Sequence, residues 1–405
     1  MKLRKINNIG IKEKNNVLKV LNSGILSNFV GSPSKYQNGG PNIIKFENLI
    51  KKKFDIKNCI SINSWSSGLD IAIGSLQLEP GDEIIVTPWT MSANVISILK
   101  WNCIPVFCDI ESDYFCIDTS KIEKLINKKT KAILYTDIFG QSADAIQINK
   151  IAKKYKLLTI ADSAQSIGAK YFGKFTGALA DIGGYSFNYH KHIHSGEGGA
   201  LVTNNKKIAE NLRLLRNHAE NFMTKNSTTN QLINMIGGNY RLCEIEASIL
   251  LVQMQKLQKI IKINNSISKV FDTFFSKYDF IKIPKIRPDC THSYYVYGLQ
   301  IIHEKPQFIR NEIRKFVKKN KFDFVFFGYQ NIHLLPIFQK KICYGKNGYP
   351  FTHNPSISYQ KGICPTSEFL HDSSFFGIEM CKYELNDNTI NVFLNKIKKV
   401  LDKFL

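Results

Sequence analysis

Between residues 58 and 205, short runs of β-branched and apolar residues alternate with stretches of helical periodicity. Seven strands are expected there: Cys59–Ile62, Glu83–Thr87, Ile104–Cys108, Ala132–Tyr135, Leu158–Ala161, Gly183–Phe187 and Ala200–Thr203. The stretches expected to be helical are Ser67–Leu76, Ser92–Trp101, Ser120–Ile126 and Ile146–Tyr155. This alternation predicts an α/β fold on a mostly parallel sheet. Ligands of such sheets bind beyond the carboxyl ends of the strands, so residues that follow strands are the first candidates for a site.

The remainder of the chain predicts a second, smaller domain. A long helix is expected over Arg241–Lys262 from its apolar periodicity. After it, strands are expected at Tyr294–Ile302 and Asp323–Phe327, and a closing helix at Asn388–Phe404. We therefore expect a large α/β/α domain over residues 1–255 and a small α+β domain over residues 256–405. Long loops, which compact domains usually keep for function, are expected at residues 221–237 and 328–362.

Composition restricts the class of protein. The formal net charge is +22, but the excess is mostly lysine spread along the chain, so a nucleic-acid surface is not favoured. The positive field would still attract an anionic substrate. The nine cysteines include no C-x-x-C pair and no zinc-finger spacing, which favours free thiols in a reducing cytosol. No window approaches the ~18 uninterrupted apolar residues of a membrane span. A cytoplasmic protein without a membrane span is expected.

The segment most informative about chemistry runs from Ser186 to Gly199 and reads SFNYHKHIHSGEGG. It places one lysine, Lys191, among three histidines, before a glycine-rich turn and a strand. A lysine that forms a Schiff base needs a lowered pKa and a partner that holds the cofactor ring. Taken alone, a lysine in so lysine-rich a chain is more often a solvated surface residue.

A candidate partner lies 29 residues earlier, where Asp162 ends the apolar run Leu158–Ala161. A carboxylate at that edge can keep a pyridine nitrogen protonated, which makes the ring an electron sink. An ordinary helix N-cap is the alternative role for this residue. A third element is the turn from Asn63 to Gly68, NSWSSG, whose helix N-terminus could bind a phosphate.

Together these segments resemble the DegT/DnrJ/StrS family of pyridoxal-phosphate-dependent nucleotide-sugar aminotransferases, which have the fold type I architecture of aspartate aminotransferase. The pattern S-F-x-x-x-K…G-E-G-G is highly specific. The resemblance extends over nearly the whole chain, through Gly24, Phe46-Glu47, Pro80–Glu83, Pro105–Asp109 and Gly237–Leu242. It implies an enzyme that transfers an amino group, usually from glutamate, to a keto-sugar for amino-sugar or surface-polysaccharide biosynthesis, lipopolysaccharide included.

The resemblance also implies roles for individual residues. Lys191 would bind pyridoxal 5'-phosphate covalently and move the proton, with pyridoxamine 5'-phosphate formed during turnover. Asp162 would bind the pyridine nitrogen and Gln165 the ring hydroxyl. The phosphate would be held by Trp65, Ser66 and Ser186, and by Asn239 from a second subunit, which implies a homodimer with shared active sites.

Two positions depart from the family pattern. The phosphate turn usually has Gly-Thr where this chain has Trp65-Ser66, which adds bulk near the site. The residue that normally stacks an aromatic ring on the cofactor corresponds to Met91. A thioether can lie against a π face, and Trp89 is the alternative for this role.

The remaining candidates are on the substrate side. His190 and His192 could contact the sugar or nucleotide, and so could Tyr329 and His333 in the second long loop, although ordinary packing is an equal explanation for that last pair. A metal at the His190–His194 alternation is disfavoured, because a charged Lys191 would repel a cation.

Two other functions stay open. Family members that dehydrate keto-sugars carry histidine at the lysine position, which disfavours dehydration here. A non-catalytic regulatory protein on the same scaffold would need a broken site, yet both Lys191 and Asp162 are present.

Overall fold

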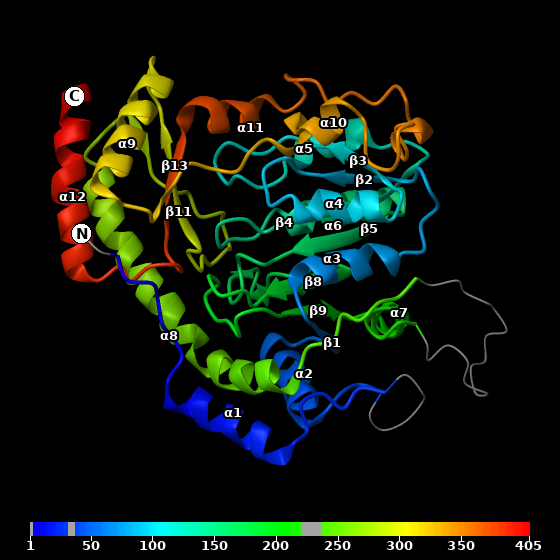
Figure 1. Cartoon of the computed structure of the whole chain (residues 1–405). Helices are drawn as coiled ribbons and strands as arrows, with labels where there is room; N and C mark the ends of the chain where they lie inside the picture. The colour runs from blue at the N-terminus through cyan, green and yellow to red at the C-terminus, as the bar shows by residue number, and fades with distance from the viewer. Residues whose placement is uncertain (1–2, 31–36, 220–235) are drawn as a thin grey trace.

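The computed structural model describes residues 3–30, 37–219 and 236–405. Its centre is a seven-stranded sheet in the order β1-β9-β8-β5-β4-β2-β3 (Figure 1). The strands are β1 (Asn58–Ile62), β2 (Glu83–Val86), β3 (Ile104–Phe107), β4 (Thr130–Thr136), β5 (Leu158–Asp162), β8 (Ile182–Ser186) and β9 (Gly199–Thr203). The five strands from β8 to β3 are parallel to one another, and β9 is antiparallel to both of its neighbours. All seven predicted strands and the mostly parallel sheet are thus confirmed.

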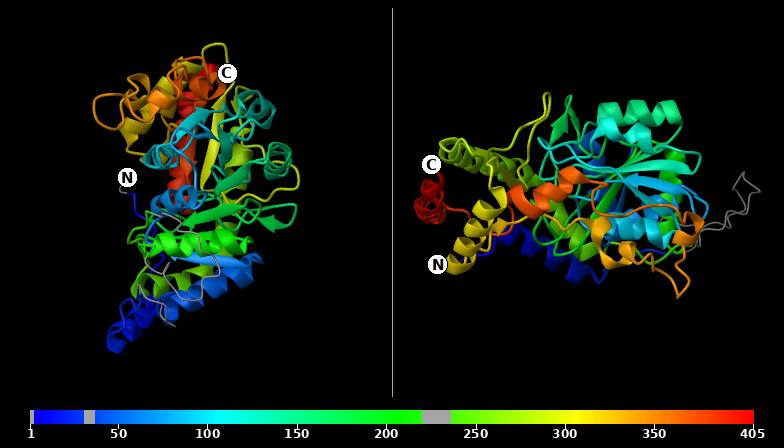
Figure 2. Two further views of the ribbon diagram at one scale, coloured as in Figure 1. Left: turned by 90° about the vertical axis from the view of Figure 1, so that its right-hand side faces the viewer. Right: turned by 90° about the horizontal axis from the view of Figure 1, so that it is seen from above.

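Helices cover both faces of this sheet, as the view from above in Figure 2 shows. One face carries α3 (Trp65–Gly74), α4 (Ala93–Lys100) and α7 (Lys206–Arg216), packed on alternate strand residues such as Ile84, Leu134 and Leu201. The other face carries α2 (Pro41–Phe54) and α6 (Ala145–Tyr155). The sheet is therefore buried on both sides, which explains why its strands are continuous apolar runs.

The long helix α8 joins the two parts of the molecule. It spans Glu244–Phe275, so it begins after the predicted Arg241 and extends well beyond the predicted Lys262. Its first half packs with α2 through Leu250 and Met254, and its last turns pack into the smaller domain through Phe271 and Phe275. Figure 1 shows α8 running from the pair α1 (Ile11–Ser23) and α2 toward α9 (Pro306–Asn320). The predicted domain boundary at 255/256 falls inside this helix, and that division stays a prediction.

The smaller domain has a four-stranded antiparallel sheet in the order β10-β11-β13-β12. Its strands are β10 (Ile281–Lys282), β11 (Val296–Ile301), β12 (Val325–Phe326) and β13 (Phe375–Glu379). Helices α9 and α12 (Asp387–Leu401) cover it. Two predicted strands and the closing helix correspond to β11, β12 and α12, whereas β13 was not anticipated.

The segment between β12 and β13 contains short helices: α10 (Pro336–Gln339), α11 (Pro365–Phe369) and brief 3-10 or π turns at Ile332–Leu334, Phe351–His353 and Leu370–Ser374. Apolar side chains of this segment, including Phe338 and Tyr359, pack against Phe107 of β3. The predicted loop at 328–362 is therefore fixed to the large sheet. Most of the other predicted loop, 221–237, lies outside the described residues.

Two general expectations concern the whole chain. Among the described helices, none is both long enough and apolar enough to cross a bilayer. All nine cysteines fall in described segments and are unpaired, and six of them are buried in the core clusters.

Candidate active site

The carboxyl ends of two neighbouring parallel strands carry two of the predicted side chains. Asp162 is the last residue of β5 and Ser186 the last of β8, and these strands pair with Asp162 opposite Gly184. Both side chains are buried. The predicted N-terminus of a helix, at Trp65 and Ser66 of α3, lies at the same edge, because the Trp65 indole reaches Asp162. The sheet thus brings together residues that are far apart in the sequence.

The N-terminus of α3 is suited to bind an anion. Ser64 is the N-cap and its Oγ accepts a hydrogen bond from the Ser67 N–H at 3.1 Å, while the N–H groups of Trp65 and Ser66 have no partner within the helix. Ser66 is exposed. A side chain at Gly199 would place its Cβ 2.8 Å from the Trp65 nitrogen, so glycine keeps this end clear.

The N-terminus of α2 shows the contrasting case. There the Glu244 carboxylate accepts hydrogen bonds from the backbone N–H groups of Asn42 and Ile43, at 2.8 and 3.0 Å. A protein carboxylate therefore already satisfies the first turn of α2, whereas the first turn of α3 is capped by the neutral Ser64 hydroxyl, and its role in anion binding stays a prediction.

Asp162 is held by two hydrogen bonds to the same oxygen. Its Oδ1 accepts from the Trp65 Nε1–H at 2.6 Å and from the Ala164 backbone N–H at 3.1 Å. Burial raises the pKa of Asp162, while the Ala164 and Asn94 contacts, the charge of Lys191 and the Trp65 indole all lower it. The Ala164 bond is the one expected of an N-cap, so the capping role and the site role coexist in this residue.

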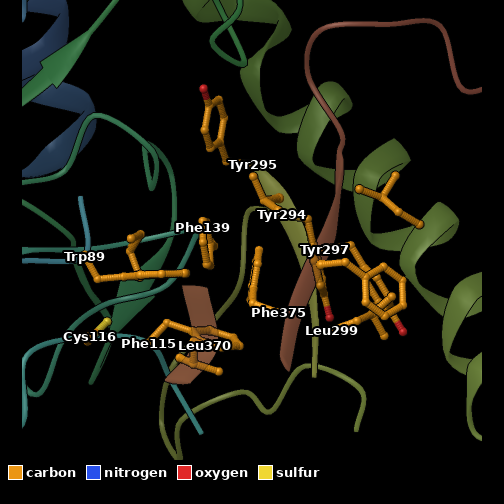
Figure 3. Close-up of a cluster of buried hydrophobic side chains, with 14 of the residues drawn as sticks. Trp89, Phe115, Cys116, Phe139, Tyr294, Tyr295, Tyr297, Leu299, Leu370 and Phe375 are labelled. Atoms are coloured by element: carbon orange, nitrogen blue, oxygen red, sulfur yellow. The ribbon is translucent and has the colours of Figure 1, made fainter. Parts of the chain in front are cut away.

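Lys191 lies in the compact turn after β8 and is buried. Its Nζ stands 4.4 Å from the centre of the Tyr295 ring. Burial lowers the pKa of Lys191 to about 8, against the opposing attraction of Asp162 and Glu379. Figure 3 shows the Tyr295 ring pointing away from the aromatic cluster formed by Trp89, Phe139 and Phe375. An amine in this position is partly neutral near physiological pH, as a nucleophile and proton carrier requires.

Gln165 and Tyr329 come together from different domains. The Gln165 Nε2 donates to the Tyr329 hydroxyl at 2.9 Å, and its Oε1 accepts from the Phe139 backbone N–H at 3.1 Å. The Tyr329 ring is stacked on Phe139, with an interplanar angle of 12°. This contact ties the segment after β12 to the edge of the large sheet beside Asp162.

Met91 and Trp89 have different environments. Trp89 is fully buried, with its ring edge-on to Phe375 and Tyr329 (Figure 3). Met91 is 57% exposed. Only Met91 thus has an accessible side chain that could lie on a bound ring, and its stacking role stays a prediction.

The histidines after β8 also differ from one another. His192 is fully buried and its Nε2 lies 2.9 Å from the Ser293 carbonyl oxygen, while His190 is half-buried beside Tyr189 and Tyr295. Burial lowers the pKa of both to about 4. In the segments 3–30, 37–219 and 236–405, no group of three or more metal-ligating side chains gathers.

His333 does not join these residues. It is fully buried against Phe107, and its Nε2 lies 2.9 Å from Glu368 Oε1. The Glu368 contact lies within the segment between β12 and β13, and the Phe107 contact packs that segment against β3. The predicted substrate contact of His333 is left without a supporting observation. Among the other predicted substrate residues, His190 and His192 both lie beside the Tyr295 ring under the lysine, and Tyr329 contacts Gln165 near the carboxylate.

Asn239 is exposed, in a short segment that runs beside the end of α7 and the phosphate turn. The neighbouring Tyr240 carbonyl accepts from the Asn63 N–H at 2.9 Å, and Asn239 itself bridges to Asn217. Its predicted contact with the phosphate of a second subunit stays a prediction.

Sequence patterns missed two neighbours of the site. Tyr295, under the lysine, was visible only as part of the predicted strand Tyr294–Ile302. The inward direction of the Trp65 side chain gave no local signal, because its partner lies 97 residues away.

Comparison with known proteins agrees with this geometry. The chain is 29% identical over 332 residues to a GDP-perosamine synthase of Escherichia coli O157:H7, covering 82% of this chain and 85% of that one. It is 30% identical over 315 residues to a pleiotropic regulatory protein of Geobacillus stearothermophilus, covering 77% of each. The structure matches Helicobacter pylori PseC, described as an aminotransferase of pseudoaminic acid biosynthesis, with a TM-score of 0.81 at 24% identity over 99% of this chain and all of that one.

The model of the DegT/DnrJ/EryC1/StrS aminotransferase family matches residues 12–361. This match includes Asp162, Lys191, the α3 N-terminus and the segment with Tyr329. The chain belongs to the DegT/DnrJ/EryC1/StrS aminotransferase family.

Proposed function

We propose that this protein transfers an amino group from an amino acid, glutamate being the expected donor, to a keto-sugar that is carried on a nucleotide. The observation that carries the proposal is Lys191: a buried amine with a lowered pKa in the turn after β8, next to the strand that ends at the buried Asp162 carboxylate. Relatives of the chain include GDP-perosamine synthases, whose name supports a nucleotide-linked sugar as substrate. The product would enter amino-sugar and surface-polysaccharide synthesis.

The residues at this edge fit pyridoxal 5'-phosphate. The α3 N-terminus at Trp65 and Ser66 would hold the phosphate together with Ser186, and Asp162 would hold the pyridine nitrogen. A protein of similar fold, NtdA of Bacillus subtilis, was solved with bound pyridoxamine phosphate, at 23% identity and a TM-score of 0.78. When bound, the cofactor supplies an electron sink for the carbon that gains or loses the proton.

Each protein group has a separate task in this scheme. Lys191 Nζ takes the proton from the substrate carbon and returns it, which its partly neutral state allows. Two N–H groups donate to Asp162 Oδ1 and favour its ionised form, against the burial that raises its pKa. Gln165 holds the Tyr329 hydroxyl through a hydrogen bond of 2.9 Å. Tyr295 covers one side of the amine and excludes water from it.

A homodimer is part of the proposal. Several large apolar side chains on α1 and just after it are exposed in the single chain, among them Ile11, Leu18 and Leu26. A second copy would cover such a surface. Exposed Asn239 would then be free to serve the partner's phosphate. The unpaired cysteines support a reducing compartment such as the cytoplasm.

Two alternatives are tested by the same variants. The first alternative is dehydration of the keto-sugar; family members that dehydrate keto-sugars carry histidine at the position that corresponds to Lys191. The similarity to a pleiotropic regulatory protein favours a non-catalytic role as the second alternative.

The experiment combines absorbance and peptide mapping. The purified protein should be yellow, lose that absorbance on addition of glutamate, and regain it when a nucleotide-linked keto-sugar is added. Borohydride should fix the cofactor to the peptide that contains Lys191. Lys191→Ala should abolish turnover, and Lys191→His should abolish transamination, with any residual dehydration detected from the sugar product. Lys206→Ala, a change at an exposed lysine, is the control. A colourless protein, or cofactor fixed to another lysine, contradicts the proposal.

A further inference from the structure

Trp65 points in two directions from the start of α3. Its backbone N–H belongs to the open first turn of the helix, while its indole is only 6% exposed and packs in the apolar cluster between α3 and β8. A side chain of this size needs space beside β8.

Two glycines supply that space. A Cβ on Gly184 of β8 would overlap the six-membered ring of Trp65, and a Cβ on Gly68 of α3 would lie 2.7 Å from the same ring. Gly184 pairs directly with Asp162 in the sheet. The ring therefore lies over the backbone of β8, next to the strand that carries the carboxylate.

The polar edge of the indole is directed at that carboxylate. The Trp65 Nε1–H donates to Asp162 Oδ1 at 2.6 Å, a short bond between two buried groups. The Ala164 N–H donates to the same oxygen. Both of these donors lie on Oδ1, so Oδ2 is the oxygen turned away from the indole, and Asn94 adds a further contact to the carboxylate.

We propose that Trp65 is a positioning residue, whose indole N–H fixes the Asp162 carboxylate so that Oδ2 receives the N–H of the cofactor's pyridine ring. This inference rests on the proposed function, because it assigns a partner to the ring-binding carboxylate. The indole role is separate from that of the Trp65 backbone N–H, which is proposed to bind the phosphate. One residue would then connect the two ends of the cofactor.

The physical consequence concerns the protonation of the ring. A buried carboxylate favours its neutral form, and the indole N–H is one of the groups that oppose this for Asp162. Without that donor the carboxylate rotates more freely and carries its negative charge less readily. The pyridine nitrogen then loses part of the anionic partner that keeps it protonated.

The test uses Trp65→Phe, which keeps an aromatic ring over Gly184 and removes the N–H. The protein is loaded with pyridoxal 5'-phosphate labelled with ¹⁵N in the ring, and the nitrogen resonance is recorded together with the ³¹P resonance. We expect the ¹⁵N resonance to move toward that of the unprotonated ring and the cofactor Kd to rise on the order of ten-fold.

Trp101→Phe is the matched control. The Trp101 Nε1–H donates to the Asp70 carbonyl oxygen at 2.6 Å, and its ring packs on Gly74 as that of Trp65 packs on Gly184. This variant loses an equivalent indole bond away from the carboxylate, so its ¹⁵N resonance should equal that of the wild type. An unchanged ¹⁵N resonance in Trp65→Phe with bound cofactor overturns the inference.

A measurement on the wild-type protein covers the case in which Trp65→Phe does not fold or bind cofactor. The indole N–H resonances of the apoenzyme and holoenzyme are compared after assignment with Trp89→Phe and Trp101→Phe. The Trp65 resonance should shift on loading, whereas that of Trp101 should not. A Trp65 indole N–H resonance that does not shift when the cofactor binds overturns the inference. Failure of the wild type to bind cofactor at all would instead contradict the proposed function.

Discussion

Two buried pairs of opposite charge lie beside the same sheet, and they are built differently. Near β1, Arg216 Nη1 contacts Glu47 Oε1 at 2.7 Å, and that oxygen also accepts from the backbone N–H and the hydroxyl of Ser61. Near β5 and β8, Asp162 and Lys191 attract each other through space, and in the described part of the chain no hydrogen bond joins them. The first pair is closed by direct contact between its charged groups, whereas the second is open, with no such contact among the described residues.

This difference separates a structural pair from a functional one. In the Glu47–Arg216 pair the two charges neutralise each other by direct contact, although Arg216 Nε and Nη2 find no partner among the described residues. Lys191 instead lies over the Tyr295 ring, and Asp162 takes its hydrogen bonds from neutral groups. Burying the charged form of Lys191 costs free energy, and this cost lowers its pKa. The proposed proton transfer depends on that lowered pKa.

The largest effect is expected from a substitution that breaks the closed pair of Glu47 and Arg216. Glu47→Gln leaves the Arg216 charge buried without a counter-ion, which should lower the free energy of unfolding by about 3–5 kcal/mol. Urea unfolding of the variant and the wild type measures this change. Cofactor bound at saturation should still be fixed by borohydride to Lys191, because Glu47 lies outside the site.

The control for that change is Glu210→Gln, at an exposed glutamate on α7 whose contact with Lys206 is 4.0 Å long. A loss below about 0.5 kcal/mol is expected there. If both variants lost equally little stability, the Glu47–Arg216 pair would not be the structural pair described above.

The second prediction concerns Lys191 of the open pair, where a substitution should raise the free energy of unfolding and not lower it. Its pKa is about 8 in the folded apoenzyme against 10.5 for an ordinary lysine, so below pH 8 folding bears the full cost of burying the charge. Lys191→Met removes this cost and should stabilise the apoenzyme at pH 7 by on the order of 3 kcal/mol. Between pH 8 and 10.5 the wild-type disadvantage should shrink, because the folded lysine is already neutral and the free-energy cost of removing its proton on folding falls as the pH approaches 10.5.

Urea unfolding of both apoenzymes at pH 7 and pH 10 measures this difference. Lys206→Met, at a lysine that is 90% exposed, is the control and should show no such pH dependence. A Lys191→Met apoenzyme less stable than the wild type at pH 7 would contradict the interpretation of Lys191 as a costly buried amine.

The sequence predicted the parts of this comparison that depend on local pattern. The strand runs gave the sheet, and the motif around Lys191 gave the family. The parts that it could not predict depend on contacts between distant segments. The Trp65–Asp162 bond spans 97 residues, and His333 turned out to be paired with Glu368 in a packed segment that its composition suggested was an open loop. Local periodicity says which side of a strand is buried, but it does not say which neighbour a side chain meets.

The third prediction has the smallest expected effect. It tests whether Asn239 of a second copy of the chain completes the site that contains Asp162 and Lys191. Asn239→Asp should weaken cofactor binding by about 1.5–3 kcal/mol, because a hydrogen bond to phosphate is replaced by repulsion. Cofactor titration measures this loss. The change should leave the Glu47–Arg216 side of the sheet unaffected, so the unfolding free energy of the apoenzyme should stay at the wild-type value.

Subunit exchange decides which chain's site Asn239 serves. If Lys191→Ala and Asn239→Asp subunits are mixed and each site takes Lys191 from one chain and Asn239 from the other, a mixed dimer has one doubly damaged site and one intact site. Equal mixing should then restore about a quarter of the wild-type activity per site. The control mixes Lys191→Ala with Asp162→Asn, both within one chain's own site, and should restore none. If proven exchange gave no recovery in the first mixture while Asn239→Asp still weakened cofactor binding, Asn239 would serve its own chain. The open pair would then be complete in a single subunit, like the closed pair at β1.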